Sequence, residues 1–241
     1  MLRARLAERL QDLLLDTDAL EDFLRHLSAL AAELATAETG RPVVCSVRLA
    51  RRRQPTVLAG SSPEALDLDG LQDGVAEGPG LEAMQTGRAV LVPDTTMDPR
   101  WRRYQRAAAQ RGNRSILAVT LLADRDATAI LTFSSTSPEA FDDAAVAVWG
   151  ALAVRAAKVM RLAVRLDSAK GLNRDLLQAM RSRTLINLAT GILMAQSRCS
   201  QSEAFELLAK VSNTRNVKLR VIAEEILQRF DEGPAGTAFS A

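Results

Sequence analysis

The chain has 241 residues, room for one large or two small domains, and its hydrophobic share of 47% is ample for folded cores and excludes a disordered protein. No apolar run approaches the length that a membrane-spanning helix needs, and the N-terminus alternates Arg and Glu with Leu, unlike a signal peptide, so we expect a cytoplasmic protein with no membrane contact. The net charge is only +2, and Cys45 and Cys199 lack the paired spacing of a zinc site or a disulfide framework, which favours two buried thiols.

The N-terminal part of the chain begins with helical patterns. Residues 1–17 are expected to form a helical extension, and Asp18 with Glu21 is typical of a cap that opens the next helix. This second helix carries an apolar stripe, formed by Phe23, Leu24, Leu27, Leu30, Ala31 and Leu34. Residues 43–49 and 56–59 then alternate like strands on either side of a basic turn, and we expect them to pair as a hairpin.

Three more strands are expected further along the chain. Residues 89–94, 115–123 and 129–135 are strand-like, and a short connection joins the last two. A closing helix should begin near Ser137, Pro138 and Glu139 and should bury Phe141, Val146, Trp149 and Leu152. The predicted order is therefore helix, hairpin, helix, strand, hairpin, helix.

This order of elements, together with several short segments, resembles a GAF domain over residues 18–161. The segments are GPGLEAMQTGRAVLVPDT at residues 78–95, DPRW at residues 98–101 and RSILAVTLL at residues 114–122. The resemblance implies an α/β sensor domain with an antiparallel sheet flanked by helices. It also implies a space between sheet and helices in which an unidentified small-molecule or protein ligand could bind.

The residues of this half favour no cofactor and no catalysis. His26 is the one histidine and cannot complete a haem or metal site alone, and Gly78, Pro79 and Gly80 carry no thiol at a turn where relatives often have one. Trp101, Trp149, Tyr104 and Phe133 could line a pocket, although core packing is the commoner role of such residues. No Gly-rich phosphate loop, nucleophile with a histidine base or metal-ligand cluster is present, so we predict no enzyme, no catalytic residue, no metal and no cofactor.

A connector helix is expected over residues 162–180. Residues at 3-4-3-4 spacing are typical of the seam of a coiled coil between two chains, and they include Val159, Leu162, Leu166, Asn173, Leu176 and Met180. Asn173 would fix the register of a homodimer, and Gly171 costs the helix about 1 kcal/mol relative to Ala. The alternative is that this stripe packs on its own domain.

Three amphipathic helices are predicted in residues 181–230, before a flexible tail at residues 231–241. The apolar residues of the first are Leu185, Leu188, Ala189, Ile192 and Leu193. A capping box of Ser200 and Glu203 opens the second helix, whose stripe is Ala204, Leu207, Leu208 and Val211. Asn216 is the expected N-cap of the third, which should bury Leu219, Ile222, Ala223, Ile226, Leu227 and Phe230.

The order of these residues resembles the ANTAR domain of bacterial antitermination regulators, through Arg183, Ile186, ATGILM at residues 189–194, EAF at residues 203–205 and NVKL at residues 216–219. The resemblance implies an all-α three-helix domain that binds RNA stem-loops in leader transcripts, whose loop bases are exposed for reading. The RNA-contacting residues that it implies are Arg183, Asn187, Thr190, Met194, Asn216, Lys218 and Arg220. Thr190 stands where the family usually has Lys, and Ala189, Gly191 and Ala204 should permit close helix packing.

The charge distribution favours the same partner. Residues 165–230 contain eleven Lys or Arg and six Asp or Glu, a balance of +5, so the rest of the chain sums to −3 against the total of +2. A basic segment on a weakly acidic body suits a polyanion. The alternative is a protein-interaction or dimerisation module of a signalling pathway whose basic residues only solvate it, and a helix-turn-helix that binds DNA is a weaker third option.

Overall fold

The computed structural model describes residues 9–10 and 12–231. Residues 1–8 and 11 of the predicted N-terminal extension, and residues 232–241 of the predicted tail, lie outside the described residues. The chain divides into two compact units, Met1–Ser168 and Ala169–Ala241.

The first unit is built on an antiparallel sheet of five strands in the order β2-β1-β5-β4-β3. The strands are β1 (Val43–Arg51), β2 (Val57–Gly60), β3 (Val90–Val92), β4 (Ser115–Ala123) and β5 (Ala127–Ser135). β1 pairs with β2 as the predicted hairpin, and β5 lies between β1 and β4 with nearly continuous pairing to both. All five predicted strands are confirmed, because their Val, Ile and Leu content suits a pleated surface covered on both faces.

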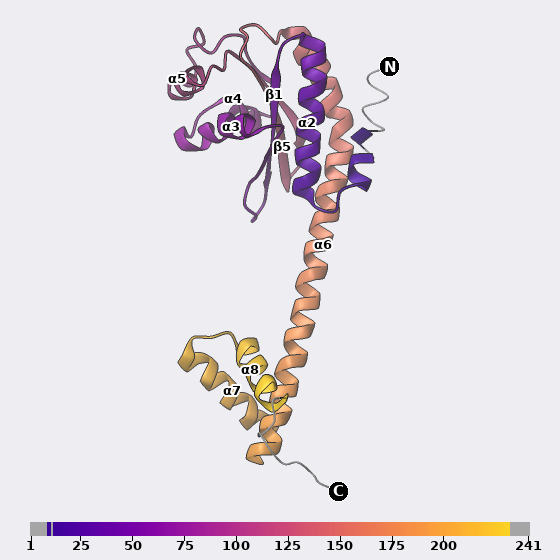
Figure 1. Cartoon of the computed structure of the whole chain (residues 1–241), viewed down its shortest axis with the longest axis vertical. Helices are drawn as coiled ribbons and strands as arrows, with labels where there is room; N and C mark the ends of the chain where they lie inside the picture. Colours follow the sequence, from indigo (N-terminus) through magenta and orange to yellow (C-terminus); the bar gives the residue numbers. More distant parts are fainter. Residues whose placement is uncertain (1–8, 11, 232–241) are drawn as a thin grey trace, which may run out of the picture. The chain divides into compact units, whose positions relative to one another are not determined.

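One face of the sheet packs against α2 (Leu20–Thr39) and the beginning of α6, as Figure 1 shows. Phe23 and Leu24 of α2, Phe133 of β5 and Trp149 of α6 are buried in this core, and the rings of Phe133 and Trp149 are 4.3 Å apart between centroids. Each fully buried side chain of this size contributes about 2 kcal/mol. The helix begins after Ala19, which is its N-cap residue and has no side chain that can accept a hydrogen bond, so the predicted start at Asp18 is one residue early.

The opposite face of the sheet is covered by three shorter helices: α3 (Pro63–Val75), α4 (Pro79–Thr86) and α5 (Arg102–Gln110) (Figure 1). Ser62 caps α3 by accepting a hydrogen bond from the N–H of Ala65, with Pro63 at the first helical position. Val90, Ala118 and Ile130 of the sheet meet Ala83 of α4 in a small apolar cluster. The part of this face that packs against α4 is therefore apolar, whereas the part beside α3 carries polar residues.

The last helix of the first unit begins later than predicted. Glu139 has a positive φ of 53°, which no helical residue adopts, and α6 starts at Asp143. Asp142 Oδ1 accepts a hydrogen bond from the N–H of Ala145 at 2.8 Å and so caps the helix. The predicted start near Ser137 is wrong because Pro138 introduces a turn and a side-chain cap is supplied only four residues later.

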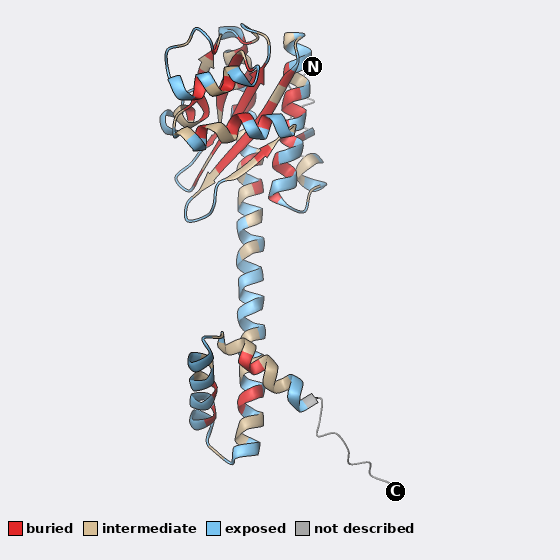
Figure 2. Cartoon of the chain, turned by 60° about the vertical axis from the view of Figure 1, so that its left-hand side comes forward, coloured by how far each residue is buried: buried red, intermediate tan, exposed pale blue. Residues whose placement is uncertain are grey.

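α6 runs from Asp143 to Ser197, and the boundary between the two units falls within it after Ser168. α7 (Gln201–Arg215) and α8 (Leu219–Asp231) complete the second unit. Figure 2 shows that the middle of α6 is exposed along most of its length, whereas its ends carry buried residues. The predicted fold class, an α/β domain followed by three helices on a long connector helix, is confirmed. In the described ranges no helix is both long and apolar enough to cross a membrane.

Candidate functional site

The three helices of the second unit share a small core. Ala189 of α6, Leu208 of α7 and both Ile222 and Ala223 of α8 are buried against one another. Ala204 of α7 is also fully buried, so the predicted role of Ala189 and Ala204 in close packing is confirmed. Short side chains at these positions let the helix backbones approach closely, which fixes the positions of the polar residues around them.

Other predictions for these helices are wrong. Gly191 is exposed and a Cβ there would meet nothing within 4 Å, so it isn't needed for packing. Four expected core residues are instead substantially exposed, namely Leu188 at 54%, Leu207 at 44%, Val211 at 41% and Phe230 at 58%. Helices of 13 to 15 residues around an alanine-rich core share only a narrow contact, so the residues at the edges of each apolar stripe remain in water.

Local hydrogen bonds define both turns of the second unit, the one before α7 and the one between α7 and α8. The capping box of Ser200 and Glu203 opens α7, as predicted. Asn216, however, is not the N-cap of α8: it ends α7 in the left-handed conformation, with φ 50° and ψ 42°. The N–H of Val217 donates to Ser212 O and that of Asn216 to Asn213 O, which is a Schellman motif with Asn in the position that Gly usually takes. Asn tolerates this conformation better than other residues with a Cβ.

The structure places Thr190 in a buried position. Its side chain is 4% exposed, and its hydroxyl donates to Ile186 O of the preceding turn at 2.7 Å. Thr190 packs where α6 faces α7 and α8, and a Thr side chain is too short to reach the surface from there. A Lys at the same position could extend its ammonium group into solvent along an apolar surface. Thr190 therefore lacks both the positive charge and the side-chain length of the residue that the family usually has there.

The remaining six predicted residues are accessible and fall into two groups. Arg183, Asn187 and Met194 lie along one side of α6, since they are spaced by four and seven residues; the first two are exposed and Met194 is half-buried. Asn216 and Lys218 are exposed at the turn between α7 and α8, and the half-buried Arg220 follows on the first turn of α8.

Arg220 lies with two arginines that the sequence reading missed. It lines a groove of about 580 Å³ together with Arg174 and Arg181 of α6. The available signal was the spacing of seven residues between Arg174 and Arg181, which places both on one helix face. They were missed because they precede the residues that resemble the family pattern.

A neighbouring basic residue is already engaged. Arg215 at the end of α7 donates to both carboxylate oxygens of Glu225 on α8, at 2.6 and 3.0 Å. These hydrogen bonds lower the pKa of Glu225 and raise that of Arg215. Arg215 therefore joins α7 to α8 and is less available to an external anion than the arginines of the groove.

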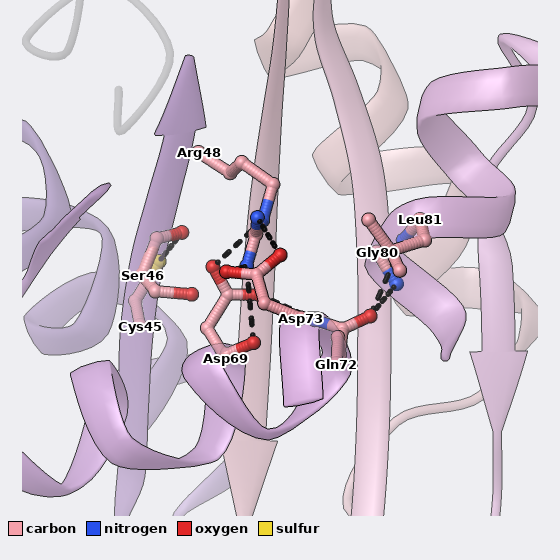
Figure 3. A network of polar contacts seen from close by, with 8 residues as sticks. All are labelled: Cys45, Ser46, Arg48, Asp69, Gln72, Asp73, Gly80 and Leu81. Atoms are coloured by element: carbon pink, nitrogen blue, oxygen red, sulfur yellow. Dashed lines mark hydrogen bonds and ion pairs between the residues drawn. The ribbon is translucent and has the colours of Figure 1, made fainter. Parts of the chain in front are cut away.

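In the first unit, a buried polar network lies between the sheet and α3, and Figure 3 shows its residues. The Arg48 side chain, on β1, is 4% exposed and donates to Asp69 Oδ2 at 3.3 Å and to the Asp69 carbonyl at 3.1 Å. It also donates to both carboxylate oxygens of Asp73, at 2.7 and 3.1 Å. Four of the five N–H groups of this guanidinium are thus used by the protein's own oxygens.

The network continues to the N-terminus of α4. The Gln72 amide N–H donates to Asp69, and Gln72 Oε1 accepts hydrogen bonds from the N–H groups of Gly80 at 2.8 Å and Leu81 at 3.2 Å (Figure 3). Gln72 Oε1 therefore occupies the two backbone N–H groups that could otherwise bind an anion at this helix N-terminus. Gly78 has φ 150° and a Cβ there would lie 2.5 Å from Gln72 Oε1, so this turn requires glycine to approach Gln72.

Burial and charge act in opposite directions in this network. Burial raises the pKa of the Asp69 carboxyl more than the Arg48 guanidinium lowers it. Burial also disfavours the charged form of Arg48, but Asp69 and Asp73 outweigh it and raise the Arg48 pKa. Around the network, Tyr104 Oη, Thr132 Oγ1 and both amide atoms of Gln105 are buried and make no hydrogen bond within the described part of the chain.

The four aromatic residues weighed as pocket residues don't share one site. Phe133 and Trp149 pack in the core under α2 and α6, and Tyr104 is buried on the other face of the sheet. Trp101 is half-buried, with the Arg100 guanidinium 4.5 Å above its ring.

Cys45 and His26 also lie apart from any shared site. Burial raises the pKa of the Cys45 thiol, and His26 is exposed on α2.

The connector residues are mostly unpacked. Val159 packs against the core of the first unit, but the five other predicted seam residues face solvent in the isolated chain. Leu162 is 50% exposed, Leu166 45%, Leu176 57% and Met180 59%. Exposed leucines at this spacing form an apolar stripe that a soluble helix seldom leaves uncovered.

Two family models match the chain. The model of the GAF domain matches residues 17–161, and the model of the ANTAR domain matches residues 174–227. No curated protein matches the chain.

Several solved structures are similar to this chain at low sequence identity. The acylhomoserine lactone-dependent LuxR family transcription factor CepR2 from Burkholderia cenocepacia is 15% identical with a TM-score of 0.50, over 69% of this chain and 97% of that one. The GAF domain of a phosphoenolpyruvate-protein phosphotransferase from Acinetobacter is 18% identical with a TM-score of 0.48, over 70% of this chain and 98% of that one. Free methionine-R-sulfoxide reductase from Neisseria meningitidis, solved with its substrate, is 18% identical with a TM-score of 0.48, over 68% and 91%. At these identities the likeness concerns the fold alone.

Proposed function

Because the chain belongs to the GAF family and ends in an ANTAR domain, we propose that it is a transcription antitermination regulator whose ANTAR domain binds structured leader RNA under the control of its GAF domain. The observation that carries the proposal is the ANTAR match over residues 174–227, which includes exposed basic residues on two sides of one helical core. We infer a cytoplasmic location, where nascent transcripts are made, and no catalytic role.

Six of the seven residues implied by the family resemblance are retained as proposed RNA contacts. Arg183, Asn187 and Met194 would contact RNA from α6, and Asn216, Lys218 and Arg220 from the α7–α8 turn and the start of α8. Arg and Lys supply phosphate contacts, and the Asn side chains can donate to and accept from the edges of loop bases.

For the GAF domain we infer that an anionic small molecule isn't the signal at the polar face of the sheet. Arg48 is neutralised by Asp69 and Asp73, and Gln72 occupies the N-terminus of α4, so an acidic ligand would have to displace the protein's own oxygens. A neutral small-molecule ligand would fit this face better, because Tyr104, Thr132 and Gln105 carry buried polar atoms with no hydrogen-bond partner among the described residues.

We further propose a homodimer through the connector. Leu162, Leu166, Leu176 and Met180 offer an apolar stripe, and Asn173 at a core-type position would set the register. In a dimer the two ANTAR domains would be held near each other, which suits a target with two stem-loops.

A specific observation favours the rival function, a protein-interaction module. α7 exposes Phe205, Leu207 and Val211 at 45%, 44% and 41%, side chains that a protein partner could cover. Lys218→Ala separates the two functions, because an exposed phosphate contact can be removed without unfolding the helix. Binding to a two-hairpin RNA, measured by fluorescence anisotropy, should weaken and become less salt-dependent in the variant. Failure of the wild type to bind the two-hairpin RNA would favour the rival, whereas binding that is unchanged in Lys218→Ala and in Arg183→Ala would place the RNA contacts on other residues.

A further inference from the structure

The groove between α6 and α8 of the second unit combines charge with an apolar wall. Its volume is about 580 Å³, within the range of sites that enclose a small organic group. Arg174, Arg181 and Arg220 supply the positive charge, Leu177 and Leu185 supply apolar surface, and Glu224 is its one acidic residue.

The three arginines of the groove differ from the arginines that are held in ion pairs. Arg48, Arg51, Arg100, Arg111, Arg114, Arg161 and Arg215 elsewhere in the chain make ion pairs, but within the described residues no carboxylate lies within ion-pair distance of Arg174, Arg181 or Arg220. Three guanidinium groups held close together repel one another, so the groove has a net attraction for an anion. A guanidinium also presents a flat face on which a base can stack and a fork that matches phosphate oxygens.

We propose that this groove binds one unpaired loop nucleotide of the RNA, with its base against Leu177, Leu185 and a guanidinium face and its flanking phosphates on Arg174, Arg181 and Arg220. The inference rests on the proposed function and extends it, because it adds Arg174 and Arg181 to the contacts and states what they hold. A duplex can't supply the occupant, since its bases are stacked and paired, whereas a loop base is free to enter.

The groove is compatible with the proposed dimer. A helix turns by about 100° per residue, so Arg174, Arg181 and Leu185 lie roughly a third of a turn from the line of Asn173, Leu176 and Met180. Two chains that pair along the seam would therefore leave the groove of each chain open.

The experiment compares arginine variants of the full-length protein on one RNA probe, the tightest two-hairpin RNA obtained from a pool with randomised loops. Arg174→Gln and Arg181→Gln remove groove charges. Arg229→Gln is the matched control, because position 229 is exposed and lies nine residues from Arg220, half a turn away on α8. Circular dichroism melting and light scattering establish that all variants keep the fold and oligomeric state of the wild type.

Each groove variant should lose roughly ten-fold in affinity or more, and Arg229→Gln should lose much less. The slope of log K against log salt should fall by about 0.7 for each lost single-strand phosphate contact. The loop bases are then replaced one at a time by abasic sites, and at one position the loss of the base should lower the affinity of the wild-type protein for the RNA. This loss of affinity should be smaller in Arg181→Gln, because the base no longer enters an intact groove.

Groove variants that bind like Arg229→Gln, or an abasic penalty that stays the same in Arg181→Gln, would overturn the groove assignment while leaving RNA binding intact. Failure of the wild type to bind any RNA of the pool would instead overturn the proposed function itself.

Discussion

Arg48 joins β1 to α3 through its contacts with Asp69 and Asp73. Its side chain is 4% exposed and lies between the buried Asp69 and the more exposed Asp73. Replacing Arg48 with Met should lower the free energy of unfolding by about 3 kcal/mol or more at neutral pH, because the buried Asp69 charge loses its partner. Denaturant unfolding followed by circular dichroism measures the loss.

The same variant has a testable pH dependence. The pKa of Asp69 is raised by burial even with Arg48 present, and removal of Arg48 should raise it further. A folded-state pKa above the unfolded value lowers stability as pH rises through it, so the penalty of Arg48→Met should be smaller near pH 4 than at pH 7. Asp73→Asn, in a side chain 61% exposed, is the control and should cost much less. A penalty that doesn't change with pH would argue against an unpaired Asp69 as its cause.

The N-cap of α7 gives a second residue-scale prediction. Ser200 Oγ accepts from the N–H of Glu203 at 3.3 Å, and the backbone N–H and hydroxyl of Ser200 donate to the Glu203 carboxylate at 2.8 and 2.7 Å. Ser200→Ala should destabilise the ANTAR domain by about 1 kcal/mol. Ser202→Ala is the control, because Ser202 is exposed and lies two residues beyond the N-cap.

These contacts also lower the pKa of Glu203, through the Ser200 backbone N–H first and its hydroxyl second. A lowered carboxyl pKa contributes stability that is present above the unfolded-state value and is lost as pH falls through the folded-state value. NMR titration of Glu203 should therefore give a higher pKa in Ser200→Ala than in the wild type, still below the ordinary value because the backbone donor remains. An unchanged Glu203 pKa would mean that the hydroxyl makes no such bond in solution.

Individual residues were predictable from sequence where local chemistry decides. The Ser200–Glu203 capping box depends on two positions three residues apart and is confirmed. Thr190 and Asn216 were assigned the wrong environments, because burial of Thr190 depends on how α6 meets α7 and α8, and Asn216 has side-chain chemistry suited to either end of a helix. Arg48 wasn't singled out at all, since its partners lie 21 and 25 residues away in sequence.

At the scale of elements, Gly171 is a weak point in α6. It lies inside the helix, and a Cβ at this position would meet nothing within 4 Å. Gly171→Ala should therefore stabilise the helix by about 1 kcal/mol without a steric cost. Hydrogen exchange of the amides of residues 168–176 should slow relative to the wild type; equal or faster exchange would show that this part of α6 isn't limited by the glycine.

The connector stripe predicts the oligomeric state. Leu166→Glu places a charge in the proposed seam and should shift the protein from dimer toward monomer, while the exposure of Leu166 keeps the cost to the single chain small. Val154→Glu is the control, because Val154 is 73% exposed on the same helix but lies about a third of a turn from Leu166. If light scattering shows that the wild-type protein is a monomer at micromolar concentration, the proposed dimer is contradicted.

The strands and helices themselves were largely readable from sequence. β4 begins and ends where its apolar run does, and the three C-terminal helices follow their periodicity. The start of α6 was misplaced because Pro138 is compatible with both a helix start and a turn. α5 was not foreseen as a helix, because RRYQRAAAQ has only Tyr104 and small alanines to bury, and its packing on the sheet is a tertiary contact.

At the scale of the whole molecule, the charge is unevenly distributed. Residues 165–230 carry a balance of +5 and the rest of the chain −3, so an RNA is attracted to the ANTAR end and repelled weakly by the remainder. The two units share α6, and we propose that a signal in the GAF domain alters the RNA affinity of the ANTAR domain through this helix. Gly171→Ala in the full-length protein should change RNA affinity if α6 carries this coupling.

The proposed binding of RNA loops by the ANTAR domain can be tested by a competition experiment at two salt concentrations. Full-length protein is bound to a labelled two-hairpin RNA, and unlabelled hairpin RNA or duplex DNA of equal length is added. We predict that affinity falls with salt and that the hairpin competes far better than the DNA, because loop bases as well as phosphates are bound. Equal competition by duplex DNA, or no binding of the hairpin RNA at the lower salt concentration, would show that the ANTAR domain does not recognise RNA loops.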